Sequence, residues 1–216
     1  LEEMKEHREN KKYLPDVKIP ENINMTDDIS NVIYDKDLLV LSIATHGIRE
    51  VLSNYNKLFN KDQVIVNVAK GIENGTLLRV SEIVSELLPN NPYAVLSGPS
   101  HAEEVARNMP TTVVSASADK RVAKYVQDVF MSPFFRVYTN PDVTGVELGG
   151  SLKNVIALGA GISDGLGYGD NTKAALMTRG ITEIARLGKK MGANNVTFSG
   201  LAGIGDLIVT CTSMYS

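Results

Sequence analysis

Short apolar runs alternate with helical periods along the first two thirds of the chain. The apolar runs lie at 35–45, 63–69, 93–96, 111–116 and 134–138. Between them, apolar residues recur every three or four positions, which predicts helices over 48–59, 77–88 and 121–130, with a short polar helix from His101. Strands without polar alternation that are separated by helices indicate a parallel sheet covered on both faces. The pattern therefore predicts a doubly wound α/β fold.

After Pro141 the strand signals end. The spacing predicts helices over 143–158 and 173–191, with a glycine-rich stretch at 159–169 between them. We therefore expect a domain boundary near Asn140 and Pro141. Residues 1–140 form a Rossmann-like unit with a parallel sheet, and residues 141–216 form an all-α domain.

Charge and composition narrow the class of partner. The 22 basic and 25 acidic residues are well mixed and give a net charge of −3, which disfavours nucleic acid and anionic membrane surfaces. The apolar runs are too short to span a membrane, and the first 12 residues are too polar for a signal peptide. The single cysteine, Cys211, excludes an intrachain disulfide and fits a reducing compartment, so we expect a cytoplasmic protein. The three histidines and this cysteine have no metal-ligand spacing.

The stretch from Gly159 to Gly165 imitates the dinucleotide fingerprint G-x-G-x-x-G. Asp164 stands at the sixth position, the segment before it is helical, and no helix signal follows it directly. These departures favour a glycine-rich helix end that packs closely on another backbone.

Two polar groups follow predicted strands. Lys70 lies after the second strand, where the carboxyl ends of a parallel sheet border the ligand crevice, so it can meet an anionic substrate; a solvated lysine at the start of a loop is the alternative. Gly98 lets the backbone approach a ligand closely, and Ser100 with Glu103 forms a capping box. The helix start at Ser100 could serve as a cap, as an anion site, or as both.

Lys153 lies in a predicted helix without a local acid. Its neighbours three and four residues away are Gly149, Gly150, Ile156 and Ala157. Such surroundings favour a lowered pKa, as a general base needs, although a lysine that reaches water from a buried helix explains the pattern equally well.

Asp206 ends a glycine-rich turn and precedes the apolar residues 207–209. It is either the N-cap of a helix or a carboxylate that accepts hydrogen bonds from substrate hydroxyls.

Together these segments resemble the bacterial type of NAD(P)-dependent sn-glycerol-3-phosphate dehydrogenase. The matching stretches are 68–73 (VAKGIE), 96–104 (LSGPSHAEE), 145–154 (GVELGGSLKN), 174–180 (AALMTRG) and 197–213 (TFSGLAGIGDLIVTCTS). They occur in the order of the family and cover the chain almost end to end. The resemblance implies an oxidoreductase that interconverts glycerol 3-phosphate and dihydroxyacetone phosphate with NAD or NADP and supplies phospholipid synthesis.

The resemblance also implies roles for single residues. Lys153 is the catalytic base, Lys70 lies between the substrate phosphate and the cofactor, and Ala102 lies near the nicotinamide. Residues 1–140 bind the dinucleotide, and residues 141–216 carry the substrate and catalytic groups. The residues implied to bind substrate are Lys70, Gly98, Ser100, Lys153, Asp206 and Ser216, the last of which begins a Ser-Arg-Asn motif.

The chain departs from the family at both ends. The family opens with a strand and a glycine-rich loop, whereas the first glycine here is Gly47, and the chain stops at Ser216 before the expected Arg and Asn. We therefore expect an internal fragment that does not run the reaction by itself. The choice between NAD and NADP, and whether the chain forms a homodimer, stay open.

Two other functions remain. A sibling dehydrogenase, such as a 3-hydroxyacid dehydrogenase or a ketopantoate reductase, resembles the lysine-bearing helix but lacks the Gly-Ile-Gly-Asp-Leu run at 203–207. A non-catalytic sugar-phosphate-binding module is the second alternative for the chain as it stands.

Overall fold

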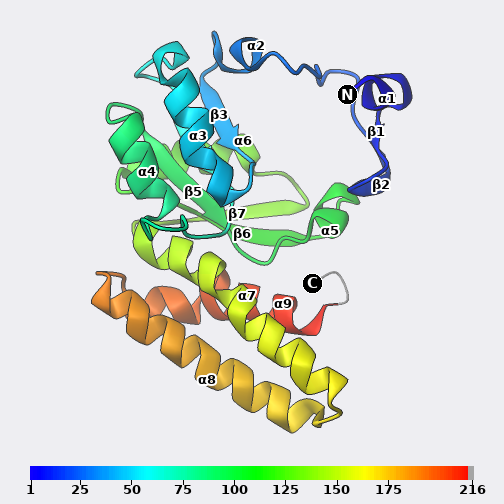
Figure 1. Cartoon of the computed structure of the whole chain (residues 1–216), viewed down its shortest axis with the longest axis vertical. Coiled ribbons are helices and arrows are strands. Elements are labelled where there is room, and N and C mark those ends of the chain that lie inside the picture. Colours follow the sequence, from blue (N-terminus) through cyan, green and yellow to red (C-terminus); the bar gives the residue numbers. More distant parts are fainter. Residues whose placement is uncertain (214–216) are drawn as a thin grey trace.

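The computed structural model describes residues 1–213. Figure 1 shows a sheet with helices packed against it, and below the sheet a layer formed by long helices. The first residues form a small separate hairpin beside the sheet. This arrangement places the last third of the chain against one end of the α/β unit.

Five strands form one sheet in the order β3-β4-β5-β6-β7. They are β3 (Leu38–Leu41), β4 (Val64–Asn67), β5 (Tyr93–Ser97), β6 (Thr111–Ala116) and β7 (Phe135–Asn140). Each lies within or overlaps an apolar run of the sequence, which confirms the Rossmann-like α/β prediction.

One pair of strands differs from the expected parallel sheet. β3, β4 and β5 are parallel, but β6 is antiparallel to β5, and β7 is parallel to β6. A parallel neighbour needs a long crossover, usually a helix that covers one face. The connection between β5 and β6 holds only α5 (Ala102–Ala106), a helix of five residues, so β6 returns along β5 in the opposite direction.

Helices cover both faces of the sheet, which explains why the strands lack polar alternation. α3 (Thr45–Tyr55), continued by the 3₁₀ turn η1 (Asn56–Leu58), and α4 (Val80–Leu87) pack on one face, where Ile65 is fully buried. α6 (Lys120–Phe130) packs on the other face against Val66. Neighbouring residues of a strand point to opposite faces, so both need apolar side chains, each worth about 1.5–3 kcal/mol when fully buried.

The part of the chain before the first predicted strand folds into short pieces. They are α1 (Glu2–His7), the antiparallel pair β1 (Glu9–Asn10) and β2 (Leu14–Lys18), and α2 (Ile29–Ile33). Arg8 holds the hairpin: its Nε donates to the carbonyl of Ile19 (3.0 Å) and its Nη2 to that of Ile23 (2.9 Å). These short elements rest on polar contacts, which hydrophobic periodicity does not detect.

The described residues of the last third form helices joined by short turns. They are α7 (Val143–Gly165), α8 (Gly169–Lys190), the 3₁₀ turn η2 (Asn195–Ser199), the π turn η3 (Leu201–Gly205) and α9 (Asp206–Thr212). Asp142 caps α7, since its Oδ1 accepts from the amide of Gly145 (2.9 Å). Among the described residues, no helix is long and apolar enough to cross a membrane.

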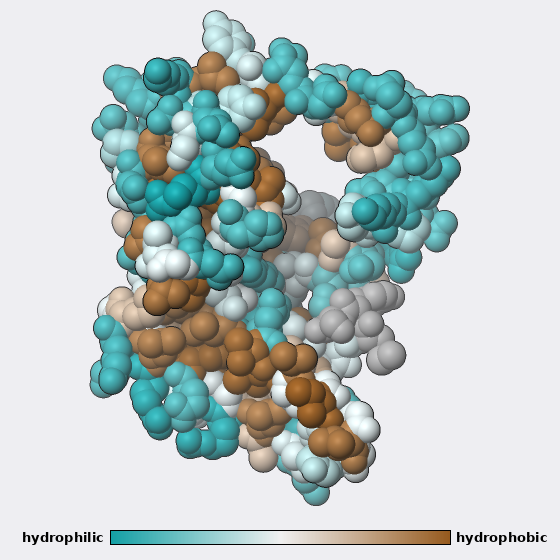
Figure 2. All heavy atoms as spheres, in the orientation of Figure 1, coloured by the Kyte–Doolittle hydropathy of each residue, from teal (hydrophilic) through white to brown (hydrophobic). Residues whose placement is uncertain are grey.

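α7 runs through the glycine-rich stretch and so rules out a dinucleotide fingerprint there. The predicted close approach of another backbone is wrong, however. A side chain at Gly159 would meet only Leu176, and Gly161 and Gly165 face open space. The exposed face of this part of α7 is apolar, as Figure 2 shows over the helical layer, with Val155 and Leu158 more than two thirds exposed.

Candidate active site

Two lysines and one aspartate from three distant segments meet at the junction of the sheet and the helical layer. The Asp206 carboxylate accepts from Lys153 Nζ at Oδ1 (2.5 Å) and from Lys70 Nζ at Oδ2 (2.7 Å). Lys70 follows β4, Lys153 lies on α7, and Asp206 is the first residue of α9. Asp206 is only 1% exposed, so this is a buried ion cluster.

Glycines bring these segments close enough to meet. A Cβ at Gly149 would lie 2.2 Å from the carbonyl oxygen of Ala202, and one at Gly203 would lie 2.2 Å from that of Phe198. A Cβ at Gly150 would lie 3.3 Å from Lys70 Cγ. Such contacts exclude any side chain at Gly149 and Gly203 unless the backbones move apart. The glycines therefore set α7 against η3, and so Lys153 against Asp206.

The surroundings of Lys153 lower the pKa of its side chain. Burial lowers the pKa of the Lys153 ammonium, the charge of Lys70 lowers it further, and Asp206 opposes both effects. The lysine is 6% exposed. No acid lies three or four residues from Lys153 on α7, as expected, but α9 supplies a carboxylate from 53 residues along the chain. Lys153 therefore lies inside a hydrogen-bonded cluster and does not extend to solvent.

Thr210 completes the cluster, and the sequence analysis missed it. Its Oγ1 accepts from Lys153 Nζ (2.6 Å) and donates to the backbone oxygen of Asp206 (2.6 Å). Thr210 follows Asp206 by four residues, a spacing that puts both on one face of a helix. This spacing of four residues was the signal in the sequence that could have indicated Thr210. It depends on knowing that a helix begins at Asp206, and the glycine-rich turn before Asp206 gives no clear helix start.

Asp206 is not a helix N-cap. Gly205 precedes α9 in helical conformation, and both carboxylate oxygens of Asp206 point to the lysines. The π turn that leads into α9 already supplies helical backbone before this position. The N-cap interpretation is therefore wrong.

The turn after β5 meets Lys70. Lys70 Nζ donates to the carbonyl of Gly98 (3.1 Å), and Ser100 Oγ donates to the same oxygen (3.0 Å). Gly98 has a φ of 152°, and a Cβ there would lie 3.0 Å from Val113 Cα, so this position requires glycine.

The capping box predicted from Ser100 and Glu103 is wrong. The N-cap of α5 is His101, whose side chain makes no capping hydrogen bond. Ser100 lies one residue before the N-cap, and its hydroxyl turns back to the Gly98 carbonyl. Ser100 therefore belongs to the turn beside Lys70 and does not hold the first amides of α5.

Two cavities meet at Lys70. The larger, of about 750 Å³, is called here the lysine cavity; it is lined by Lys70, His101, Lys153, Asn154, Ala157, Leu158, Gly161, Ile162 and Thr210. The second, of about 610 Å³, is called here the apolar cavity; it is lined by Val68, Lys70, Leu96, Ser100, Ala102, Val105, Asn108, Met109, Val113, Phe130, Ser132, Phe134 and Phe135. Lys70 and Lys153 both line the lysine cavity, and most of the residues around the apolar cavity are aliphatic or aromatic.

The charge of the cluster supports an anionic ligand. With both lysines protonated, the two ammonium groups and one carboxylate sum to +1, and Lys70 is partly exposed to both cavities. The residues that the structure describes contain no group of three His, Cys, Asp or Glu side chains that could hold a metal ion. Ser216, the remaining predicted substrate residue, lies outside the described residues.

Two family models match the chain in succession. The N-terminal model of NAD-dependent glycerol-3-phosphate dehydrogenase matches residues 1–123, and the C-terminal model of the same family matches residues 142–216.

Individual relatives agree with the family models. The chain is 56% identical to glycerol-3-phosphate dehydrogenase [NAD(P)+] of Desulfitobacterium hafniense (strain Y51), over 99% of this chain and 60% of that protein. It is 55% identical to the protein of that name from Bacillus subtilis (strain 168), over 100% of this chain and 64% of that one. The crystal structure of glycerol-3-phosphate dehydrogenase from Coxiella burnetii is 39% identical and superposes with a TM-score of 0.96, covering 100% of this chain and 66% of that chain. The chain thus spans between 60% and 65% of the length of the curated relatives it matches.

Proposed function

The chain belongs to the NAD-dependent glycerol-3-phosphate dehydrogenase family, and we propose that the protein interconverts sn-glycerol 3-phosphate and dihydroxyacetone phosphate with NAD or NADP. The observation that carries the proposal is the buried Lys153, held by Asp206 and Thr210 beside a second lysine at the edge of a cavity. In the cell, this reaction would supply glycerol 3-phosphate for phospholipid synthesis.

Lys153 is the proposed base of the reaction. Its lowered pKa raises the fraction of neutral amine near physiological pH, and a neutral amine can accept the proton of the substrate's C2 hydroxyl. In the reverse direction the ammonium returns that proton to the forming alkoxide. Among the described residues, Asp206 and Thr210 take two of its three donor directions, which leaves one for the substrate oxygen. A bound nicotinamide supplies or takes up the hydride at C2.

Lys70 and the turn after β5 are proposed to bind the rest of the substrate. Lys70 offers a cation at the meeting point of the two cavities, where it can neutralise the phosphate and the charge that develops on the alkoxide. Gly98 and Ser100 bring their backbone and hydroxyl groups to Lys70. Asp206 can accept a substrate hydroxyl with the remaining lone pairs of its oxygens. We propose that Ser216 also binds the substrate.

The residues present fit a nicotinamide group. Ala102 and Lys70 line the apolar cavity, whose other walls are mainly aliphatic and aromatic, as a flat heteroaromatic ring requires. We therefore propose that Ala102 and Lys70 contact the cofactor there.

We also propose that two domains of the chain have separate functions. The family models leave residues 124–141 between them, β7 ends at Asn140, and α7 begins at Val143, which supports residues 1–140 as the dinucleotide-binding domain and 141–216 as the substrate and catalytic domain. We further propose a cytoplasmic enzyme whose partner is its small-molecule substrate, without nucleic acid or membrane. A homodimer is consistent with this proposal.

Ligand binding and turnover separate this function from the alternatives. We would follow the melting temperature of the protein with glycerol 3-phosphate, dihydroxyacetone phosphate and NADH. A sibling dehydrogenase would not respond to glycerol 3-phosphate, whereas a binding module would respond and show no turnover. Turnover is measured in a chimaera, in which this chain replaces the aligned 60% of the Desulfitobacterium relative.

Lys153→Met is the decisive variant in the chimaera. We expect kcat to fall at least about a hundredfold, because proton transfer by a positioned side chain contributes that much, while KM changes less. Lys189→Met, at an exposed lysine near the end of α8, is the matched control and should keep the parent kcat. A near-normal kcat in the Lys153 variant would remove this lysine from the chemistry.

A further inference from the structure

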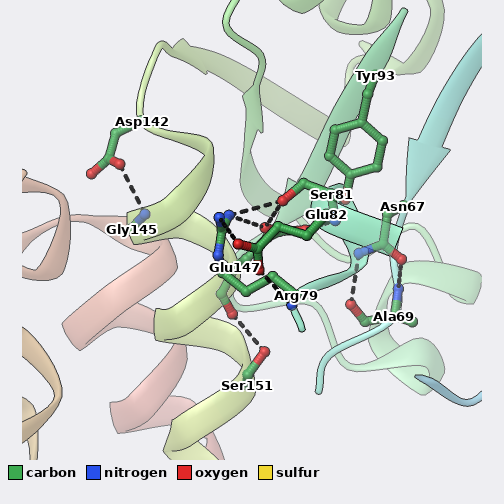
Figure 3. Close-up of polar contacts among 10 residues, drawn as sticks. All are labelled: Asn67, Ala69, Arg79, Ser81, Glu82, Tyr93, Asp142, Gly145, Glu147 and Ser151. Carbon is green, nitrogen blue, oxygen red and sulfur yellow. Dashed lines mark hydrogen bonds and ion pairs between the residues drawn. The ribbon is translucent and has the colours of Figure 1, made fainter. Parts of the chain in front are cut away.

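A second buried polar cluster lies on α7, away from the lysines. Glu147 is 6% exposed, yet its carboxylate accepts four hydrogen bonds. Oε1 accepts from the amide of Ser81 (2.8 Å) and from Tyr93 Oη (2.7 Å), and Oε2 accepts from Ser81 Oγ (2.6 Å) and Arg79 Nη1 (2.8 Å). Figure 3 shows these donors converging on Glu147 from the start of α4 and from β5. Glu147 therefore joins the helical layer to the α/β unit.

Glu147 performs the capping of α4. Helix starts leave their first amides without partners, and an N-cap side chain usually accepts one of them. The N-cap position here is Arg79, whose side chain has only donors, and the amide of Ser81 instead reaches a carboxylate 66 residues along the chain. The negative charge also suits the positive end of a helix. The start of α4 is thus complete only when α7 lies in its place.

The donors to Glu147 are fixed by burial. Burial raises the pKa of the Tyr93 hydroxyl well above its usual value, and the negative charge of Glu147 raises it further, so the tyrosine remains a donor. Arg79 also pairs with Glu82 (3.1 Å) and is held on two sides. A buried carboxylate with this many donors tolerates little displacement, because every bond lost leaves a desolvated polar group.

Lys153 lies six residues after Glu147 on the same helix, which is about 9 Å along its axis. The residues between them include Gly149 and Gly150, whose surroundings leave no space for a Cβ beside Ala202 and little beside Lys70. A small shift of α7 would therefore move Lys153 against its partners or away from them.

We propose that Glu147 is a positioning residue of the active site: by binding the start of α4 and Tyr93 it sets α7 on the sheet, and so places Lys153 beside Lys70 and Asp206. This inference rests on the proposed function only in taking Lys153 as the base. Its test therefore measures the pKa of Lys153 directly and does not depend on enzymatic turnover.

The experiment is competitive acetylation of the 216-residue protein over a series of pH values, with peptide mass spectrometry to obtain the pKa and reactivity of each lysine. In Glu147→Gln the amide would present a donor to Arg79 or Ser81, which loosens α7 and lets water reach Lys153. We expect the pKa of Lys153 to rise toward the ordinary lysine value, because burial is the first cause that lowers it. Loss of the negative charge alone, without displacement of α7, would lower this pKa further, so the sign separates the two effects.

Glu73→Gln is the matched control. Glu73 is also a buried glutamate with an arginine partner, Arg49 (2.8 Å), but its hydrogen bonds to Arg49 and Thr76 stay within the α/β unit. This variant should leave the pKa and the acetylation reactivity of Lys153 unchanged.

Tyr93→Phe removes one donor to Glu147 and should give a smaller shift in the same direction; it carries the test if Glu147→Gln does not fold. An unchanged or lowered Lys153 pKa in folded Glu147→Gln, or in Tyr93→Phe if that variant alone folds, overturns the proposal. Failure of the proposed function would appear elsewhere, as normal kcat in the Lys153→Met chimaera.

Discussion

Replacing Asp206 by asparagine removes the charge that balances two lysines while it preserves the shape of the side chain. Both oxygens of Asp206 accept from ammonium groups, and the side chain is 1% exposed. In the variant, one of these positions becomes an amide nitrogen that can only donate, and it faces a lysine. Lys153, whose side chain is 7% exposed, then holds a charge in a poorly solvated place without a counter-ion.

The cost follows from burial. Breaking a buried ion pair by removing one partner destabilises a protein by about 3–5 kcal/mol, because an uncompensated charge stays behind. Lys70 reaches solvent with 23% of its side chain, so most of the cost falls on Lys153. For a chain of 216 residues, each kcal/mol shifts the melting temperature by roughly 2–4 °C. We therefore expect Asp206→Asn to lower the melting temperature by about 10 °C at neutral pH.

Thermal unfolding followed by circular dichroism measures this shift. Asp119→Asn is the control, since Asp119 pairs with Arg121 on the surface with 41% of its side chain exposed, and loss of such a pair costs at most about 1 kcal/mol. Adding Lys153→Met to Asp206→Asn removes the unpaired charge and should restore part of the loss. If the double variant is as unstable as the sum of the two single variants, the buried charge is not the cause.

Three further predictions follow from other contacts. Lys70→Ala in the chimaera should reduce kcat/KM more for dihydroxyacetone phosphate than for unphosphorylated dihydroxyacetone, and equal losses would contradict a phosphate role. Gly149→Ala should destabilise the protein because its Cβ would meet the Ala202 carbonyl, whereas Gly161→Ala, on the same helix in open space, should stabilise it by up to about 1 kcal/mol; the two urea midpoints measure this contrast. Tyr93 has a raised pKa in the folded state, so its contribution to stability is complete below pH 10 and is lost as pH rises above it; Tyr93→Phe should therefore lose less stability between pH 10 and 11 than the parent protein, and parallel losses would refute the assignment.

Much of the fold could be predicted because its elements are local. β4 and α6, for example, lie within one or two residues of their predicted bounds, since an apolar run and a helical period are set by neighbours in sequence. The direction of β6 was not predicted. It depends on whether the connection after β5 crosses over the sheet, and α5, with five residues, is too short for such a crossover. The capping of α4 by Glu147 was equally hidden, since 66 residues separate donor and acceptor.

The electrostatic interactions of the candidate site also depend on contacts between residues far apart in the sequence. A lowered pKa at Lys153 was one of two interpretations of its small, uncharged helical neighbours, and this pKa is lowered, with burial as the first cause. The sequence analysis did not detect that Lys70 lowers this pKa or that Asp206 raises it, because both arrive through tertiary contacts. The approach of α7 to η3 depends on Gly149, whose lack of a side chain is visible in the sequence but whose neighbour is not.

Asp206 therefore has a part that neither interpretation of the sequence included. If it only bound substrate hydroxyls, its oxygens would point into the lysine cavity with the lysines elsewhere; instead each oxygen already holds one ammonium. Each carboxylate oxygen can accept a second hydrogen bond, so a hydroxyl can still bind there. The same group that would orient the substrate thus also restrains Lys70 and Lys153 from separating by repulsion. The proposed base, Lys153, and the proposed phosphate-binding cation, Lys70, are stable side by side because Asp206 lies between them.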